Sequence, residues 1–210
     1  MVNMKEEVFA LPLRENFSEG ESSYDRVMNK VLNVAKVNQG QIEAIMNTIA
    51  YHESAGTMDP SKKQDKGGPA RGLFQYELSS KLGSHSKGSG AGRTAMNRLY
   101  DVLGGKLPTS TRKGTNLNNM PKWMEPYFEK DKNGKFVASG DVNFSDLTAT
   151  QQRTLFLADK LKTKGAIPAI GMIRESDWWA KFHHKGTESN KAGFVSDSNQ
   201  FNRSGSIIPK

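Results

Sequence analysis

The chain has 210 residues, of which 35% are hydrophobic and 25% charged, with a formal net charge of +8 and a pI near 9.6. This length suits one domain with extended ends, and the composition is globular rather than disordered or fibrous. The absence of cysteine excludes disulfides, thiolate metal sites and a cysteine nucleophile. The positive charge predicts attraction to a polyanion. Charge alone does not distinguish nucleic acid, a membrane surface and an acidic bacterial wall polymer as that partner.

The N-terminal segment does not have the pattern of a targeting sequence. In Met1–Gly20 the apolar patch Val8–Leu13 contains Pro12 and follows acidic residues, which is the wrong order for a signal peptide. Nowhere does the sequence contain the roughly 18 consecutive apolar residues that a membrane-spanning helix needs. We therefore expect no membrane span and no export through a signal peptide.

Five segments carry apolar residues at helical spacing, and we expect helices over residues 23–37, 41–53, 93–103, 148–165 and 176–184. The third is stopped by Gly104, and the fourth is opened by a capping box of Thr148 and Gln151. The polar stretches between them, residues 57–72 and 79–92, are expected to be loops.

A turn sequence, Asp131–Gly134, lies between two apolar pairs and predicts a β-hairpin. The fold class expected is therefore mainly α (α+β), with a small β-hairpin element. We expect an N-terminal arm at residues 1–22, one domain at 23–186, and a Ser/Asn-rich tail or surface strap at 187–210.

Glu53 is the first candidate for chemistry. It lies four positions after Ile49, on or beside the apolar stripe of its helix, and at the C-terminal end. Burial and the negative end of the helix dipole both disfavour the charged carboxylate, so the pKa should rise. A carboxyl that stays protonated near neutral pH is what cleavage of a glycosidic bond requires. The alternative is that Glu53 is a solvated surface residue.

The neighbours of Glu53 distinguish these alternatives. Glu53-Ser54-Ala55-Gly56 is followed, after a polar loop, by Gly72-Leu73-Phe74-Gln75-Tyr76-Glu77. This arrangement resembles the lysozyme-like superfamily, specifically lytic transglycosylases and goose-type lysozymes, in which a Glu-Ser pair ends a helix and a Gly-Leu-Met/Phe-Gln segment lines the saccharide groove. The resemblance covers residues 41–77 well and the rest in outline. It implies a lysozyme-like fold and cleavage of peptidoglycan glycan strands.

The resemblance implies a role for each residue of the segment. Gly72 would let backbone approach the sugar, Phe74 would offer an apolar face, and the amide of Gln75 would bind sugar or acetamido groups, with Ser54 and Tyr76 as further substrate-binding residues. Alternatively, Gly72 is a turn residue and Phe74 a core residue.

Glu77 occupies the place where goose-type lysozymes carry an acidic residue, so it is a candidate second catalytic carboxylate that orients water; Asp59 and Asp65 are weaker candidates. Without such a group, the resemblance implies a lytic transglycosylase, the outcome that we favour over a hydrolytic muramidase. Alternatively, Glu77 is a surface acid.

Transglycosylases place a Tyr-Asn pair before a glycine on a late helix. Here His183 and His184 precede Gly186 and are the nearest equivalent for substrate binding, a departure that leaves open how the oxocarbenium-like state is stabilised. The histidines lack the spacing of a metal site, and no nucleotide-binding or serine-hydrolase motif occurs, so we expect no cofactor and no metal.

Lys62, Lys63, Lys66 and Arg71 crowd the loop between the motifs without interleaved aromatic residues, which argues against nucleic acid as the partner. The expected partner is the peptidoglycan glycan strand, and the resemblance suggests a bacteriophage protein. It would be either a virion component docked to other phage proteins, which we favour, or an endolysin released from the host cytoplasm to the cell wall. A non-catalytic virion structural or glycan-binding protein that keeps the fold is the remaining alternative.

Overall fold

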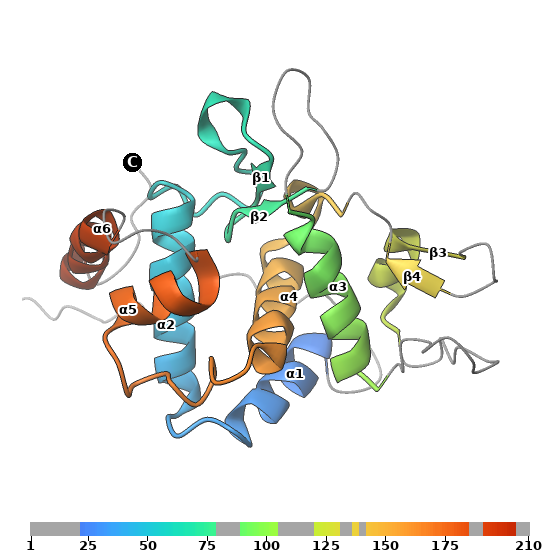
Figure 1. The fold of residues 1–210 in the computed structure, drawn as a ribbon, viewed down its shortest axis with the longest axis horizontal. Coiled ribbons are helices and arrows are strands. Elements are labelled where there is room, and N and C mark those ends of the chain that lie inside the picture. The colour runs from blue at the N-terminus through green and yellow to red at the C-terminus, as the bar shows by residue number, and fades with distance from the viewer. Residues whose placement is uncertain are drawn as a thin grey trace, which may run out of the picture.

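The computed structural model describes residues 22–78, 89–104, 120–130, 136–138, 142–184 and 191–204. Within these residues the protein is mainly helical with small antiparallel β elements, as predicted (Figure 1). None of the described helices combines the length and apolar character needed to cross a bilayer. The predicted N-terminal arm, apart from its last residue, and the loop at residues 79–88 lie outside the described residues.

The first two helices begin at side-chain caps. Helix α1 (Ser23–Leu32) starts after Ser22, whose hydroxyl accepts from the Asp25 amide, and it ends before the predicted Val37. Helix α2 (Gln39–Glu53) starts at a capping box between Asn38 and Gln41, which replaces the missing backbone partners of the first turn. The predicted apolar stripe of α2 is confirmed, because Ile42, Ile45, Met46, Ile49 and Ala50 are buried.

Helix α4 occupies the centre of the fold. Figure 1 shows α4 (Ala149–Lys162) between α2 and α3 (Ala91–Val102), with α1 beneath. The predicted capping box of Thr148 and Gln151 opens α4. From Gln152 to Lys160 every residue of α4 is buried, so this helix forms the core on which the others pack.

Two short antiparallel ribbons flank the helices. Strands β3 (Phe128–Lys130) and β4 (Phe136–Ala138) form the predicted hairpin, whose turn residues Asp131–Gly134 lie outside the described residues. Strands β1 (Ala70–Arg71) and β2 (Tyr76–Glu77) form a second ribbon that the sequence did not predict. Short 3-10 turns, η1, η3 and η4, cover Asp65–Gly67, Lys122–Tyr127 and Phe144–Asp146.

The C-terminal part contains more helix than expected. The predicted helix over residues 176–184 is present as α5 (Glu175–Trp179), continued by a π-helical segment, η5 (Ala180–His184). The predicted tail or strap contains a helix, α6 (Lys191–Ser204), that lies against α2 and α5 (Figure 1). Phe194 on α6 is fully buried, so this helix is part of the packed domain.

The turn between β1 and β2 is fixed by a buried amide, that of Gln152 on α4. Its Oε1 accepts from the Leu73 amide at 2.7 Å, and its Nε2 lies 2.7–2.9 Å from the carbonyl oxygens of Pro60, Phe144 and Leu147. Gly72 has a φ of +81°, and a Cβ there would come within 2.4 Å of Gln152 Oε1. Glycine is therefore required at residue 72 by conformation and by space.

We predict that Gly72→Ala destabilises the protein much more than Gly165→Ala. Gly165 has a φ of +79° but no neighbouring atom within 4 Å of a Cβ. Alanine at residue 165 should therefore lose only about 1 to 2 kcal/mol of unfolding free energy through backbone strain. Alanine at residue 72 should cost the same backbone strain plus about 1 to 3 kcal/mol of unfolding free energy from overpacking. Urea denaturation measures both; equal losses would contradict the proposed role of Gln152.

Candidate active site

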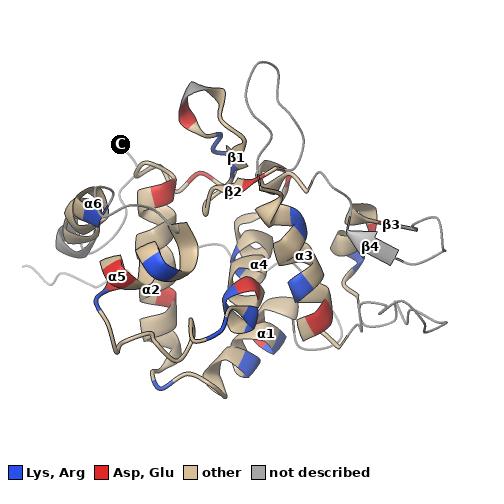
Figure 2. Ribbon diagram, viewed as in Figure 1, with Lys and Arg blue, Asp and Glu red and all other residues tan. Residues whose placement is uncertain are grey.

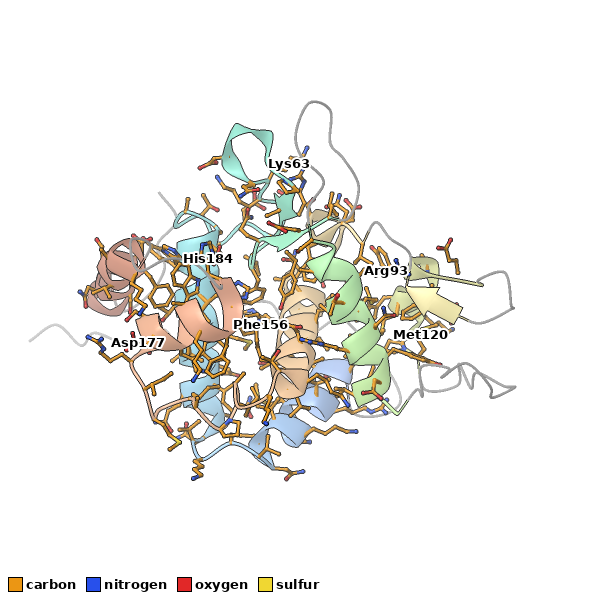
Figure 3. All side chains as sticks on the ribbon, viewed as in Figure 1. Lys63, Arg93, Met120, Phe156, Asp177 and His184 are labelled. Atoms are coloured by element: carbon orange, nitrogen blue, oxygen red, sulfur yellow. The ribbon has the colours of Figure 1, made fainter. Side chains whose placement is uncertain are left out.

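A pocket of about 560 Å³ opens where the end of α2, η5, β2, α3 and the C-terminal half of α4 meet. Among the residues predicted from the sequence, those that line it are Glu53, Gln75, Tyr76, Glu77, His183 and His184. Figure 3 shows His184 near the end of α2 and Phe156 in the interior. The fold thus brings the predicted segments together at one cavity.

Glu53 is the last residue of α2, and its side chain is only 12% exposed. The indole N–H of Trp179 donates a hydrogen bond to Glu53 Oε1 at 2.7 Å. His183 Nε2 lies 3.5 Å from the same oxygen. The carboxyl is therefore held at one oxygen in a largely buried position at the pocket wall.

This position changes the acidity of Glu53. Burial raises the pKa of the Glu53 carboxyl above its ordinary value, since the charged form loses solvation. The hydrogen bond from Trp179 and the electrostatic interactions with His52, His184 and Lys160 lower the pKa in opposition, but burial is the larger effect. Glu53 thus keeps its proton to a higher pH than an exposed glutamic acid, as its place beside the apolar stripe predicted.

His183 is a neutral hydrogen-bond donor in this site. Its Nε2 lies 3.0 Å from the carbonyl oxygen of Phe74, which can only accept, so Nε2 carries a hydrogen. Burial lowers the pKa of His183 well below its ordinary value, and the charge of Lys160 adds to this effect. The imidazole therefore links η5 to the segment after β1 without contributing a charge.

His184 has a different position. Its ring is stacked on that of Trp179, with the ring centroids 4.6 Å apart and the planes 13° from parallel. The residue is exposed on its other side and lines the pocket. The two histidines predicted as a pair therefore contact different neighbours.

Three residues predicted to bind substrate do not line the pocket. Ser54 is fully buried, and its hydroxyl accepts from the Met58 amide at 2.9 Å, which fixes the turn after α2. Phe74 is fully buried and stacks on Phe156 at 4.3 Å, so its ring is in the core and does not offer an apolar face to a sugar. At Gly72 the space that a Cβ would fill faces Gln152 rather than the pocket. The alternative interpretations, core and turn, describe Phe74 and Gly72 correctly.

Gln75 and Tyr76 do line the pocket, but the side chains of both form hydrogen bonds with other residues of the protein. Gln75 has a φ of +47°, and its Nε2 donates to the Gly72 carbonyl at 2.8 Å, which braces the turn. The Tyr76 hydroxyl donates to Asp159 Oδ2 at 2.9 Å, and its ring stacks on Phe144 at 4.5 Å. These contacts fix the part of the pocket wall that Gln75 and Tyr76 form.

Glu77 shares the pocket with Glu53. Its Oε2 accepts from the backbone N–H of Ser89, just before α3, at 2.8 Å. The weaker candidates lie elsewhere: Asp59 accepts from Ser61 in a local turn, and Asp65 pairs with Lys62 on the surface. Among the three acids predicted for the second catalytic role, only Glu77 lines the pocket.

Sequence reasoning missed a buried charged cluster on the pocket floor. Asp159 Oδ1 accepts from Arg98 at 2.5 Å, and its Oδ2 lies 2.8 Å from Lys160 Nζ. Burial alone would raise the pKa of Asp159, but the charges of Lys160 and Arg98 and their hydrogen bonds outweigh it and hold the pKa below its ordinary value. The signal available in the sequence was this acid–base pair within the apolar run Leu155–Leu161.

The basic residues near β1 do not form one surface. Arg71 is buried and donates to the carbonyl oxygens of Gly68 and Ala70, whereas Lys62 pairs with Asp65. Figure 2 shows Lys and Arg on several elements, including α1 and α3, as well as beside β1. Within the described part of the chain, no three His, Asp or Glu side chains gather in a way that would hold a metal ion.

Comparisons of the chain with protein-family models, curated proteins and solved structures found no match. The chemistry of the pocket is therefore inferred from its own residues.

We predict that Glu53→Gln stabilises the protein increasingly as the pH rises. A carboxyl whose pKa is raised on folding binds its proton more tightly in the folded state, so its contribution to stability is lost as the pH rises from about 4.3, the unfolded value, through the folded pKa. Glutamine cannot ionise and avoids this loss. The Tm difference between the variant and wild type should be larger at pH 8 than at pH 4. Glu125→Gln at an exposed site is the control, and a difference independent of pH would contradict the prediction.

Proposed function

We propose that this protein cleaves the glycan strand of bacterial peptidoglycan at the β-1,4 bond between N-acetylmuramic acid and N-acetylglucosamine, with Glu53 as the general acid. The observation that carries the proposal is the buried carboxyl of Glu53, with its raised pKa, at the wall of an open polar pocket. A glycosidic oxygen leaves poorly until it is protonated, and an acid with a raised pKa is able to protonate it near neutral pH.

In the proposed reaction, Glu53 gives its proton to the glycosidic oxygen as the bond from C1 of muramic acid to that oxygen breaks. The bonding electrons leave with the N-acetylglucosamine, and positive charge develops on the muramic ring. The Glu53 carboxylate formed in this step accepts the hydrogen bond from Trp179. The fate of the ring then decides whether the enzyme is a lyase or a hydrolase.

We favour the lytic transglycosylase. In this outcome the C6 hydroxyl of muramic acid attacks its own C1, and its proton passes to the Glu53 carboxylate, which restores the acid and forms a 1,6-anhydro ring. The alternative is a muramidase in which Glu77 orients water. Among the described carboxyls that line the pocket, Asp159 is committed to Arg98, Lys160 and Tyr76, whereas Glu77 has one oxygen held by Ser89. Glu77 is thus the candidate for the water-orienting role.

The sequence supports a wider proposal. The likeness of Glu53-Ser54 and the segment from Gly72 to Glu77 to lytic transglycosylases and goose-type lysozymes suggests a lysozyme-like, wall-degrading protein of a bacteriophage. It would act either as a virion component or as an endolysin. The net charge of +8 would favour binding to the anionic polymers of the wall.

Digestion of purified peptidoglycan tests the proposal. Glu53→Gln should lower the cleavage rate by about 10²- to 10⁴-fold, because the leaving group is no longer protonated. Glu125→Gln, an exposed change outside the pocket, should leave the rate unchanged. Undiminished cleavage by Glu53→Gln would refute its role, and no cleavage by wild type would favour a non-catalytic glycan-binding or virion structural protein.

The products separate the two outcomes. A lytic transglycosylase releases 1,6-anhydromuramic ends, and Glu77→Gln should then keep at least about one tenth of the rate, since a proton-transfer group is worth about 10²-fold or more. Reducing muramic ends, together with a loss of about 10²-fold or more in Glu77→Gln, would contradict the lyase and select the muramidase. Mass spectrometry of the released fragments distinguishes the two kinds of end.

A further inference from the structure

The two oxygens of the Glu53 carboxyl have different surroundings. Oε1 accepts a hydrogen bond from the indole N–H of Trp179 at 2.7 Å, and His183 Nε2, whose hydrogen points to the Phe74 carbonyl, lies 3.5 Å from the same oxygen. Within the described residues, no hydrogen bond reaches Oε2. The carbonyl oxygen of a protonated carboxyl accepts hydrogen bonds better than its hydroxyl oxygen, so the Trp179 N–H favours Oε1 as the carbonyl oxygen and the proton on Oε2.

We propose that Trp179 is a positioning residue that fixes Oε1 as the acceptor and presents the proton on Oε2 to the substrate, and that α6 belongs to the active site because it holds the indole in place. This inference deepens the proposed function and rests on it for the catalytic role of Glu53. The role of Trp179 was not evident from the sequence.

The indole ring is enclosed by other rings. His184 from η5 stacks on it with centroids 4.6 Å apart, and Phe194 from α6 stacks on it at 5.1 Å with the planes 21° from parallel. The edge of the ring system meets His52 of α2 at 4.9 Å, and Trp179 is only 1% exposed. A ring enclosed in this way cannot turn its N–H away from Glu53 without displacing its neighbours.

Helix α6 is attached to α2 and to α5 by polar contacts. Asp197 Oδ2 lies 2.7 Å from His52 Nδ1 on α2, next to Glu53 in the chain. Lys191 pairs with Asp177 at 3.2 Å, which joins α6 to α5. Figure 3 shows Asp177 at α5. These two attachments keep Phe194 against the indole.

Trp179 also affects the pKa of Glu53. Its N–H stabilises the carboxylate that remains after proton transfer, and it lowers the pKa of Glu53 against the effect of burial. The other groups that act on Glu53 are His52, His184 and Lys160, while His183 is neutral. Removing only the indole N–H should therefore raise the pKa of Glu53 and weaken it as an acid.

Trp179→Phe removes the N–H and keeps an aromatic ring, and Trp178→Phe is the matched control. Trp178 is equally buried, and its N–H donates to the Ala166 carbonyl at 2.7 Å, away from Glu53. Two readouts are needed: the pH at which the ¹³C-labelled Glu53 carboxyl titrates by NMR, and the pH profile of kcat/KM on purified peptidoglycan.

In Trp179→Phe the Glu53 titration and the alkaline limb of the profile should both move to higher pH, and kcat/KM at the optimum should fall on the order of 10- to 100-fold. Trp178→Phe should lower the Tm but shift neither the Glu53 titration nor the alkaline limb of the profile. Phe194→Leu should shift the titration in the same direction by a smaller amount, whereas Val195→Ala, at a 44% exposed position on α6, should not.

If the Glu53 carboxyl titrates at the same pH in Trp179→Phe and in Trp178→Phe, the proposed role of Trp179 is overturned. An unchanged titration in Phe194→Leu would overturn the role of α6. If wild type does not cleave peptidoglycan, the proposed function fails, but the NMR titration still decides whether Trp179 sets the state of Glu53. The two failures are therefore distinguishable.

Discussion

The burial of one carboxyl group, that of Glu53, is the constraint around which the rest of the structure is arranged. A buried carboxylate is unfavourable, so the group needs either a proton or donors, and among the described residues the one hydrogen bond to it is that of Trp179 to Oε1. Helix α2 brings the carboxyl to the pocket, and α5 and η5 bring Trp179 and His183 to it. Helix α6 then closes the cluster from outside. Segments far apart in the sequence thus converge on one acid.

The pocket contains a second buried carboxyl in the opposite situation. Asp159 lies between Arg98 and Lys160, so its pKa is lowered, while that of Glu53 is raised. Environments that push two carboxyl pKa values apart are typical of acid–base chemistry. Here the paired group, Asp159, anchors Tyr76 and the pocket floor, and the unpaired group, Glu53, keeps a proton to transfer. This division of roles is a property of the tertiary structure.

Features that depend on local sequence were predictable. The apolar stripe of α2 and the capping box of Thr148 depend on residues three or four positions apart, and both are present. The placement of Glu53 at a helix end beside apolar residues was enough to predict its raised pKa. The hairpin of β3 and β4 followed from its turn residues for the same reason.

Features that depend on distant partners were not predictable. Gly72 and Phe74 do not line the pocket as expected, because Gln152 and Phe156, on a helix far along the chain, fill the space beside them. Helix α6 was missed because few apolar residues mark it, and its stability depends on contacts of Phe194 with Trp179 and His52. A sequence pattern identifies the acid more readily than the residues that hold it.

The most direct test of the account is a crystal structure of Glu53→Gln bound to a peptidoglycan glycan fragment that spans the scissile bond. We expect the fragment to lie in the pocket, with a glycosidic oxygen within about 3.2 Å of the residue 53 side-chain atom that Trp179 does not contact. A fragment bound elsewhere, or one whose glycosidic oxygens all lie beyond the reach of residue 53, would contradict the assignment of Glu53 as the acid.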